Sequence, residues 1–366
     1  MSGLENVPDQ MLACQVVEFG QPYKIHHIPV PKDLQPHDLL LKTAVASLCH
    51  TDNMVRAGIF RPPLPCTASH EGAGTVAAVG SSVTDFRIGD RVMAGLYLHP
   101  CDACDDCKAG LPQYCQKCEG AIGVHTQGAF AEYVRIDART AAKLPDAVSF
   151  ATAAPLACAG CTIFRAIKQA GVQRGEWLGL VGAGGGLGHL GIQFAKALGV
   201  RVVGVDARDE GLALARATGP EVVVDARGGK EAVVKAAQEV TEGKGVHATV
   251  NISEAPEAAA TACAMTRMHG LMVQIAQPDQ VSVPFRELIF RNIRIHSSLV
   301  SSVAEEREML QVVAEHNIHV STNPVHGLQA IPQLLELAQS GKMKGKGIVI
   351  VDPEQMERER EGGAKV

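Results

Sequence analysis

Aromatic side chains, an excess of basic charge and long apolar runs are all scarce in this chain. Phe, Trp and Tyr together make up 4% of the residues, and the charged residues, 20%, leave a formal net charge of -5. Without a basic excess there is no positive field of the kind that holds nucleic acid or an anionic membrane, so we expect neither partner. No apolar run approaches the roughly 20 residues that cross a bilayer, which favours a soluble protein.

The beginning of the chain and its cysteines both indicate the cytoplasm. The segment MSGLENVPDQMLACQ has neither a basic stretch followed by an apolar one nor an Arg-rich amphipathic pattern, so we expect no targeting segment. The 11 cysteines are odd in number and concentrated in one region, unlike the paired cysteines of a small secreted domain. In a reducing compartment, clustered thiols more often bind metal.

The order of the expected elements predicts an α/β protein with two domains, since 366 residues exceed the usual size of one domain. Up to about residue 150 the pattern is that of short strands separated by turn residues. We expect these strands at 11–19, 39–47, 72–80 and 89–97.

From Ala151 onward, expected helices and strands alternate, which is typical of a doubly wound parallel sheet. Six strands would complete this sheet near residue 298. The later helices at 305–316 and 330–339 and the strand at 346–352 could then return to the first domain. We expect the highly charged tail, 354–361, to be a solvated end.

A glycine cluster between an expected strand and an expected helix predicts a dinucleotide site. Glycine lets the backbone turn tightly and approach a pyrophosphate, whose charge then meets free amides at the start of the helix. The candidate cofactor-binding residues of this turn are Gly182, Gly184, Gly185, Gly186, Leu187 and Gly188.

Asp206 ends the next expected strand, 18 residues after Gly188, where a carboxylate can accept hydrogen bonds from the ribose hydroxyls. That charge repels the additional phosphate of NADP, so NAD is the expected cofactor. Arg208 argues in the other direction, because a cation at this position could bind the same phosphate. A turn that only packs is the alternative to a cofactor site.

Four cysteines with the spacing C-x2-C-x2-C-x7-C predict a structural metal site. Four thiolates so close in sequence can surround one tetrahedral Zn²⁺ and leave no coordination position open. Cys118 is a fifth candidate that could replace the last of the four. An iron-sulfur cluster, disulfides and free thiols are the alternatives. The predicted ligands are Cys101, Cys104, Cys107 and Cys115.

The motifs taken together identify a family. In the order in which they occur, the chain resembles medium-chain, zinc-dependent alcohol dehydrogenases, with the greatest likeness to the yeast-type fungal branch. The resemblance extends from about residue 11 to residue 352. It is carried by CHTD at 49–52, SHEGAG at 69–74, the four-cysteine loop, LACAG at 156–160 and GAGGGLG at 182–188.

This resemblance implies a GroES-like, mostly-β catalytic domain with both zinc sites in residues 1–157. It further implies a Rossmann cofactor domain in residues 158–298, and a return segment in residues 299–366 that completes the catalytic domain. Assembly as a homo-oligomer, a tetramer or else a dimer, is also implied.

The resemblance also implies a catalytic zinc held by Cys49, His70 and Cys158. Two thiolates and one imidazole leave a fourth position for water or the substrate oxygen, an arrangement of which alcohol dehydrogenases are the type example. Zinc would act there as a Lewis acid. By the same resemblance Thr51 takes the proton of the alcohol, the alternative being a Thr that only bonds to the backbone of a turn. Glu71 tunes the metal or assists ligand exchange, or else pairs with a nearby cation.

Two cofactor contacts and one departure complete the implied site. His50 corresponds to the position that contacts the pyrophosphate, and Lys346 could supply a charge against the phosphates, or else be an exposed loop lysine. Many relatives have a proton-relaying histidine where this chain has Met54, and methionine cannot relay a proton. His125 matches no role in the family, and we expect a loop residue.

The substrate pocket is expected to be roomy. Phe60 and Tyr97 stand where yeast enzymes have tryptophans, and smaller rings favour primary or secondary alcohols and aldehydes larger than ethanol. Three alternatives remain: a zinc-free quinone or enone reductase of the same superfamily, a polyol dehydrogenase, and a catalytically silent binding protein.

Overall fold

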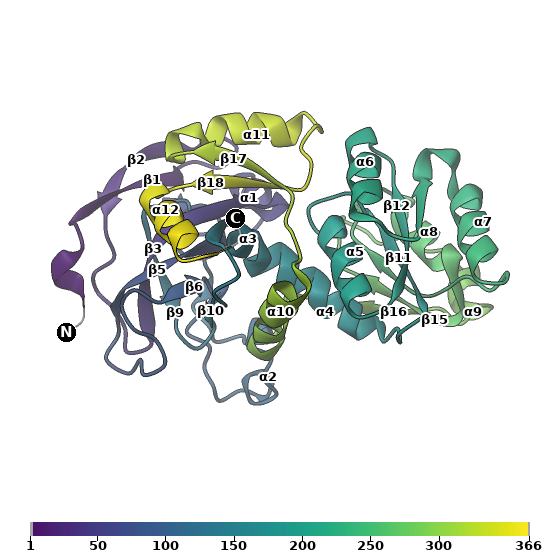
Figure 1. Ribbon diagram of the computed structural model, residues 1–366, viewed down its shortest axis with the longest axis horizontal. Coiled ribbons are helices and arrows are strands. Elements are labelled where there is room, and N and C mark those ends of the chain that lie inside the picture. Colours follow the sequence, from purple (N-terminus) through teal and green to yellow (C-terminus); the bar gives the residue numbers. More distant parts are fainter. Residues whose placement is uncertain (1–2, 365–366) are drawn as a thin grey trace.

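Two lobes of regular structure, joined by one long helix, make up the chain in a computed structural model that describes residues 3–364 (Figure 1). One lobe is rich in strands and holds both the first 150 residues and the last part of the chain. The other is the alternating helix and strand region drawn in teal and green. Segments that are far apart in sequence therefore meet in the first lobe.

The largest sheet of the first lobe has seven strands in the order β10-β6-β5-β3-β18-β17, and β9 also pairs with β3. Strand β3 is the centre, and all but one of its residues are buried. These strands are β3 (Asp38–Leu48), β5 (Glu71–Val79), β6 (Arg91–Met93), β9 (Tyr133–Asp137), β10 (Ala142–Lys143), β17 (Thr322–His326) and β18 (Lys346–Ile350).

Shorter elements surround this sheet. Two small sheets have the orders β2-β1-β4 and β7-β8. Their bounds, with those of the neighbouring helices, are η1 (Leu4–Asn6), β1 (Gln10–Val16), β2 (Lys24–Pro29), α1 (His50–Arg56), β4 (Cys66–Thr67), β7 (Tyr97–Leu98), α2 (Asp105–Lys108), η2 (Pro112–Tyr114), β8 (Gly120–Ala121), η5 (Leu328–Ala330) and α11 (Ile331–Gln339).

The expected single strand at 89–97 is wrong, because the chain forms β6 and β7 with a break between them. Gly95 lies in this break, where a Cβ atom would come 2.3 Å from the backbone of Thr140. The close approach of the two backbones bends the chain away from a straight strand.

The second lobe contains six parallel strands in the order β13-β12-β11-β14-β15-β16, which confirms the expected doubly wound sheet. Its elements are β11 (Trp177–Val181), α5 (Gly188–Ala197), β12 (Arg201–Asp206), α6 (Asp209–Thr218), β13 (Val222–Asp225), η4 (Ala226–Gly228), α7 (Lys230–Val240), β14 (Val246–Asn251), α8 (Ala258–Met265), β15 (Thr266–Gln274), α9 (Phe285–Ile289) and β16 (Arg294–Ser297).

One continuous helix, Phe150–Ala170, connects the lobes. It consists of α3 (Phe150–Pro155), a π-helical turn η3 (Leu156–Gly160) and α4 (Cys161–Ala170). Its 21 residues are long and apolar enough to cross a membrane, contrary to the expectation that no run approaches that length. Because 83% of its apolar window is buried in the protein, as in the core helix of a soluble protein, this is weak evidence for a membrane span.

The end of the chain returns to the first lobe. Helix α10 (Val303–His316) leaves the second lobe, and β18 pairs antiparallel with β3, so that Gly347 faces Leu48. This pairing agrees with the expected return of the segment. The expected domain bounds, 1–157, 158–298 and 299–366, stay a prediction.

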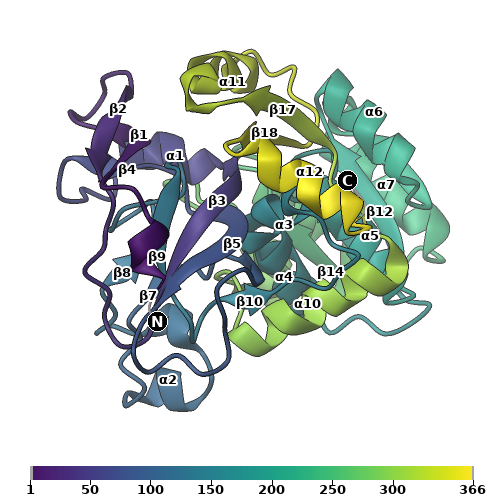
Figure 2. The ribbon, with the colours of Figure 1, turned by 60° about the vertical axis from the view of Figure 1, so that its left-hand side comes forward.

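The charged tail, which we expected to be a solvated end, is instead the helix α12 (Pro353–Glu361), drawn in yellow in Figure 2. Gln355, Met356 and Glu359 are buried. The Glu359 carboxylate accepts hydrogen bonds from the Arg91 guanidinium and from the Phe150 backbone N–H, both at 2.9 Å. Charged residues can bury in this way when an opposite charge and hydrogen bonds offset much of the desolvation cost.

We predict that Glu359→Ala lowers the melting temperature, because it leaves the first amide of α3 without its acceptor and the Arg91 guanidinium without its counter-charge. The expected loss is about 1–3 kcal/mol. Glu357→Ala is the matched control, since Glu357 is exposed on the same helix. Scanning calorimetry of both variants measures the difference, and equal melting temperatures would contradict the tethering role of Glu359.

Candidate functional site

Three distant segments bring metal-binding side chains to one point between the lobes. Cys49 precedes α1, His70 precedes β5, and Cys158 lies in the π-helical turn η3. One ligand atom from each of these residues, together with one from Glu71, lies within 4.8 Å of the others. The three expected ligands of a catalytic zinc are therefore adjacent in the fold.

The buried carboxylate of Asp52 holds two of these segments together. Its Oδ2 accepts from the backbone N–H of Cys49 at 2.8 Å, and its Oδ1 accepts from that of Ser69 at 3.1 Å. The same Oδ1 lies 3.6 Å from Nδ1 of His70, which leaves the other ring nitrogen for a metal. Sequence reasoning gave Asp52 no role, although the residue is part of the CHTD motif.

The local backbone presents Cys158 to the other two ligands. A π-helical turn inserts one additional residue into a helix, and such turns occur frequently at functional sites. In this turn Leu156, Ala157, Ala159 and Gly160 are buried, while Cys158 remains partly accessible at the surface of the cleft.

The electrostatics of the cluster fit a divalent cation. Contact with Cys158 is the largest effect that holds the pKa of Cys49 well below its ordinary value, and the same contact raises the pKa of Cys158. A metal binds thiolates, so the lowered pKa of Cys49 favours the form that a cation requires. Two sulfurs and one imidazole are a donor set typical of zinc. The Glu71 carboxylate of the same group is paired with Lys346, which favours a fourth position left for water or substrate.

Glu71 and Lys346 form a buried ion pair behind the cluster. The Lys346 ammonium lies 2.7 Å from Oε2 and 3.0 Å from Oε1 of Glu71, and it also donates to the carbonyl of Leu48. Burial raises the pKa of Glu71 to about 7. Burial lowers the pKa of Lys346, but the Glu71 charge raises it above its ordinary value.

Lys346 is thus 4% exposed, and the alternative of an exposed loop lysine is wrong. Its side chain also passes the glycine-rich turn, since a Cβ atom on Gly186 would lie 2.9 Å from its Cδ. The predicted contact of Lys346 with cofactor phosphates stays a prediction.

The second group of potential ligands is the four-cysteine loop. One sulfur from each of Cys101, Cys104, Cys107 and Cys115 lies within 4.8 Å of the others. Backbone amides point at the sulfurs: the N–H of Cys101 donates to Cys115, that of Cys104 to Cys101, and that of Cys107 to Cys104. The amides of Ala103 and Cys104 lower the pKa of Cys101 to about 6. Such donors stabilise thiolates, so the loop fits a structural zinc, while Cys118 is outside this group.

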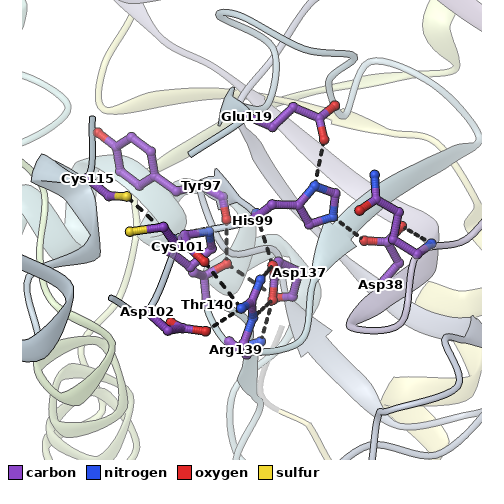
Figure 3. A network of polar contacts seen from close by, with 12 residues as sticks. Asp38, Tyr97, His99, Cys101, Asp102, Cys115, Glu119, Asp137, Arg139 and Thr140 are labelled. Carbon is purple, nitrogen blue, oxygen red and sulfur yellow. Dashed lines mark hydrogen bonds and ion pairs between the residues drawn. The ribbon is translucent and has the colours of Figure 1, made fainter. Parts of the chain in front are cut away.

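A polar network anchors the loop to the first lobe (Figure 3). The Arg139 guanidinium donates to the buried Asp137 carboxylate, to the Pro100 carbonyl and to Asp102 inside the loop. On the other side of Asp137, the His99 imidazole lies 2.7 Å from Asp38 and 2.6 Å from Glu119. Both ends of the loop are therefore fixed by charged contacts.

The glycine-rich turn lines a cavity of about 670 Å³ at the carboxyl ends of the parallel strands. Gly182 has a φ of +96°, a conformation that side chains other than glycine rarely adopt. Asp206 accepts from the amides of Gly184, Ala207 and Arg208. A carboxylate has about four acceptor sites, so about one remains for a ribose hydroxyl. Of the residues predicted to bind the cofactor here, the cavity is lined by Gly182, Gly185, Gly186, Leu187 and Asp206.

A smaller pocket of about 250 Å³ adjoins this cavity, because Leu187 and Ile252 line both. The pocket reaches the Cys49, His70 and Cys158 cluster. It also contains the predicted proton acceptor and the two predicted substrate-pocket rings, so that its lining includes Thr51, Phe60 and Tyr97.

Two further residues in this pocket were not expected. Glu254 lies 3.4 Å from Nε2 of His50, the residue predicted to contact the pyrophosphate. His125 is a loop residue, as expected, but its ring also lines the pocket. Neither has a motif around it that would reveal its place. Met54 is not among the pocket-lining residues that the structure describes.

Comparisons with known proteins agree with this geometry. Residues 35–146 match the family model "Alcohol dehydrogenase GroES-like domain", and residues 186–315 match "Zinc-binding dehydrogenase". An alcohol dehydrogenase of Geobacillus stearothermophilus is 33% identical over 346 residues, covering 93% of this chain and 100% of that protein. The chain belongs to the medium-chain, zinc-type alcohol dehydrogenase family.

Other members of this alcohol dehydrogenase family are similarly related. Alcohol dehydrogenase 1 of Emericella nidulans is 32% identical over 94% of this chain and 99% of its own. The crystal structure of the alcohol dehydrogenase from Aeropyrum pernix superposes with a TM-score of 0.84 at 28% identity, covering 93% of this chain and 99% of that chain. The fold class predicted from the sequence is confirmed, as is the assignment to oxidoreductases that act on small alcohols and aldehydes.

We predict that Lys346→Met destabilises this dehydrogenase by about 3–5 kcal/mol, because it leaves the Glu71 carboxylate buried without a counter-charge. Lys344→Met is the control, since Lys344 is exposed two residues away. Thermal unfolding of the two variants beside the parent measures the effect. If Lys346→Met has the same melting temperature as the parent, the ion pair does not stabilise the site.

Proposed function

We propose that the protein is a zinc-dependent alcohol dehydrogenase that transfers hydride reversibly between a primary or secondary alcohol, or its aldehyde or ketone, and NAD. The observation that carries this proposal is the meeting of Cys49, His70 and Cys158 in a pocket that adjoins the glycine-lined cavity. When bound, zinc supplies a Lewis acid and the nicotinamide supplies the hydride acceptor.

The side chains of the chain then bind, orient and move the proton. Cys49, His70 and Cys158 would hold the catalytic zinc, with the His70 ring oriented by Asp52. The Thr51 hydroxyl, 3.8 Å from the Cys49 sulfur, is placed to accept the proton of the alcohol. Glu71, fixed by Lys346, is a carboxylate that tunes the metal site from behind.

NAD is the proposed cofactor because Asp206 stands at the end of β12 with an acceptor site left for a ribose hydroxyl. His50, Gly185 and Gly186 would meet the pyrophosphate. Gly184 and Gly188 do not line the cavity, and their part in cofactor binding stays a prediction. Arg208 keeps NADP as the second candidate, since it also lines the cavity.

Phe60 and Tyr97 leave a pocket of about 250 Å³, which supports substrates larger than ethanol. Because Met54 cannot relay a proton, release would use the ribose and water or another group of the pocket. We further propose a soluble, cytoplasmic enzyme. The likeness to the yeast-type fungal branch stays a prediction, since a bacterial and a fungal relative are 33% and 32% identical.

Homo-oligomerisation, as a tetramer or a dimer, is supported by an exposed apolar surface at one edge of the six-stranded sheet. Strand β16 is the last strand in that sheet, and all four of its residues are exposed. Such an edge with unburied apolar side chains is typical of a protein interface. The exposed fractions on and beside it are Phe285 65%, Ile289 70%, Phe290 67%, Ile295 42% and Met268 55%.

We predict that zinc-loaded protein reduces NAD with a panel of primary, branched and aromatic alcohols, and reduces NADP less well. Cys158→Ala should abolish turnover and leave the melting temperature close to that of the parent, because the cysteine is a ligand and not a core residue. Absorbance at 340 nm measures both cofactors. No turnover of any alcohol together with reduction of an enone would favour the reductase alternative. No turnover of either class would favour the non-catalytic binding protein.

We predict two zinc ions per chain, one of them lost in Cys104→Ser together with part of the thermal stability. Cys118→Ser is the matched control and should retain both ions, because Cys118 lies outside the four-cysteine group. Elemental analysis of the dialysed variants gives the count. If Cys118→Ser loses a zinc ion, or if Cys104→Ser retains both zinc ions, the assignment of the four ligands is wrong.

We predict that Phe290→Glu lowers the molar mass in solution, because a charge cannot be buried unpaired at an apolar interface. Light scattering coupled to size exclusion measures the mass. Val17→Glu, a substitution of a side chain 40% exposed on the other lobe, should leave the mass unchanged. A parent protein that is already monomeric would overturn the oligomer proposal.

A further inference from the structure

His125 lines the same pocket as Cys49 and Cys158, yet no step of the proposed reaction uses it. It lies in the loop between β8, which ends at Ala121, and β9, which begins at Tyr133. The lining contains apolar and aromatic side chains, among them Phe60 and Val124, and also polar ones such as Gln277 and Ser298. A titratable ring at this position can contact a bound substrate without taking part in the reaction.

The ring is held in one orientation. Its Nδ1 accepts a hydrogen bond from the backbone N–H of Ala121 at 3.2 Å. Phe60 meets it edge-on, with ring centroids 6.2 Å apart and an interplanar angle of 77°. Gly120 leaves the room for it, since a Cβ atom there would lie 2.5 Å from the Cβ of His125.

The hydrogen bond to Nδ1 determines which ring nitrogen carries the hydrogen in the neutral form. A nitrogen that accepts from a backbone N–H has no hydrogen of its own, so in the neutral ring the hydrogen is on Nε2. Among residues 3–364, no protein group accepts a hydrogen bond from that Nε2. His125 is exposed and lines both this pocket and a neighbouring one, so it offers a free N–H donor that a bound substrate can reach.

The charges that line the pocket determine whether a neutral or an anionic acceptor of the substrate can bind to His125. Burial lowers the pKa of His125, so the ring is neutral near pH 7. Neither lysine nor arginine is among the described residues that line the pocket, and Glu254 adds a negative charge to it. An anionic group would find no lysine or arginine there, whereas a neutral oxygen would find the N–H donor of His125.

We propose that His125 recognises a second, neutral oxygen of the substrate, so that the preferred substrates are alcohols and aldehydes with a further hydroxyl, ether or carbonyl group. This inference rests on the proposed function and narrows its substrate class. The apolar wall of the pocket packs the carbon chain between the reacting carbon and the second oxygen. His125 is thereby a specificity-determining residue.

The test compares straight-chain primary alcohols with α,ω-diols and ω-hydroxy ethers of the same number of heavy atoms. At one chain length we expect the ratio of kcat/KM, oxygenated substrate over plain alcohol, to pass through a maximum. A set of ω-hydroxycarboxylates of the same lengths is measured beside them, and it should be used less well than the diols.

Two substitutions of His125 distinguish binding of the substrate oxygen from a structural role in the loop 122–132. His125→Asn keeps an acceptor near the position of Nδ1 but lacks a donor at the position of Nε2, and His125→Gln places an amide N–H near Nε2. We expect His125→Asn to lower the maximal ratio by about tenfold, the effect of one hydrogen bond, and His125→Gln to retain most of it. Leu299→Ala, which changes the pocket volume from a different segment of the lining, should alter both substrate classes alike.

The outcomes distinguish this inference from the proposed function. Turnover of plain alcohols with a ratio that is the same in the parent, His125→Asn and His125→Gln overturns the inference alone. If His125→Asn retains the maximal ratio and His125→Gln loses it, the role of His125 is to support the loop and not to bind substrate. If the ω-hydroxycarboxylates are preferred to the diols, the second group that the pocket recognises is not a neutral oxygen. No turnover in any series contradicts the proposed function and this inference with it.

Discussion

The carboxylate of Asp52 is the contact on which the geometry of the site depends. It is fully buried, and it bonds to the backbone beside Cys49 and beside His70, two segments that lie far apart in the sequence. A buried carboxylate that lost these donors would cost the full penalty of its desolvation, so both segments stay in place. The result is a cluster of sulfur and nitrogen atoms formed before any ligand is bound.

A second long-range interaction connects the end of the chain to this cluster. Strand β18 pairs with β3 across about 300 residues of sequence, and it brings the Lys346 ammonium onto Glu71. The ammonium balances a charge that would otherwise lie unpaired beside the sulfurs of Cys49 and Cys158. Since Lys346 also touches the glycine-rich turn, one side chain links the metal cluster with the cofactor cavity.

Much of this architecture can be predicted from the sequence for clear physical reasons. Strands of a parallel sheet are buried on both faces, so 201–206 and 246–251 are recognisable as apolar runs, and the alternation with helices then implies the topology. The four-cysteine loop needs only local spacing. The set of Cys49, His70 and Cys158 follows only from family resemblance, because no local rule brings three such distant residues together.

The rest depends on tertiary contacts that no local pattern reveals. The tail 354–361 is charged enough to suggest a solvated end, yet Glu359 finds Arg91 and the start of α3. His125 has an ordinary loop sequence, and only the folded pocket shows what its ring faces. Glu254 meets His50 for the same reason, through a contact across the two lobes.

Anomalous diffraction at the zinc edge, from crystals of the zinc-loaded protein, tests the central claim most directly. The account predicts two peaks, one inside the four-cysteine loop and one bounded by Cys49, His70 and Cys158 with one coordination position free of protein. A single peak in the loop, with the three other side chains apart or joined to a fourth fixed protein ligand, would contradict it.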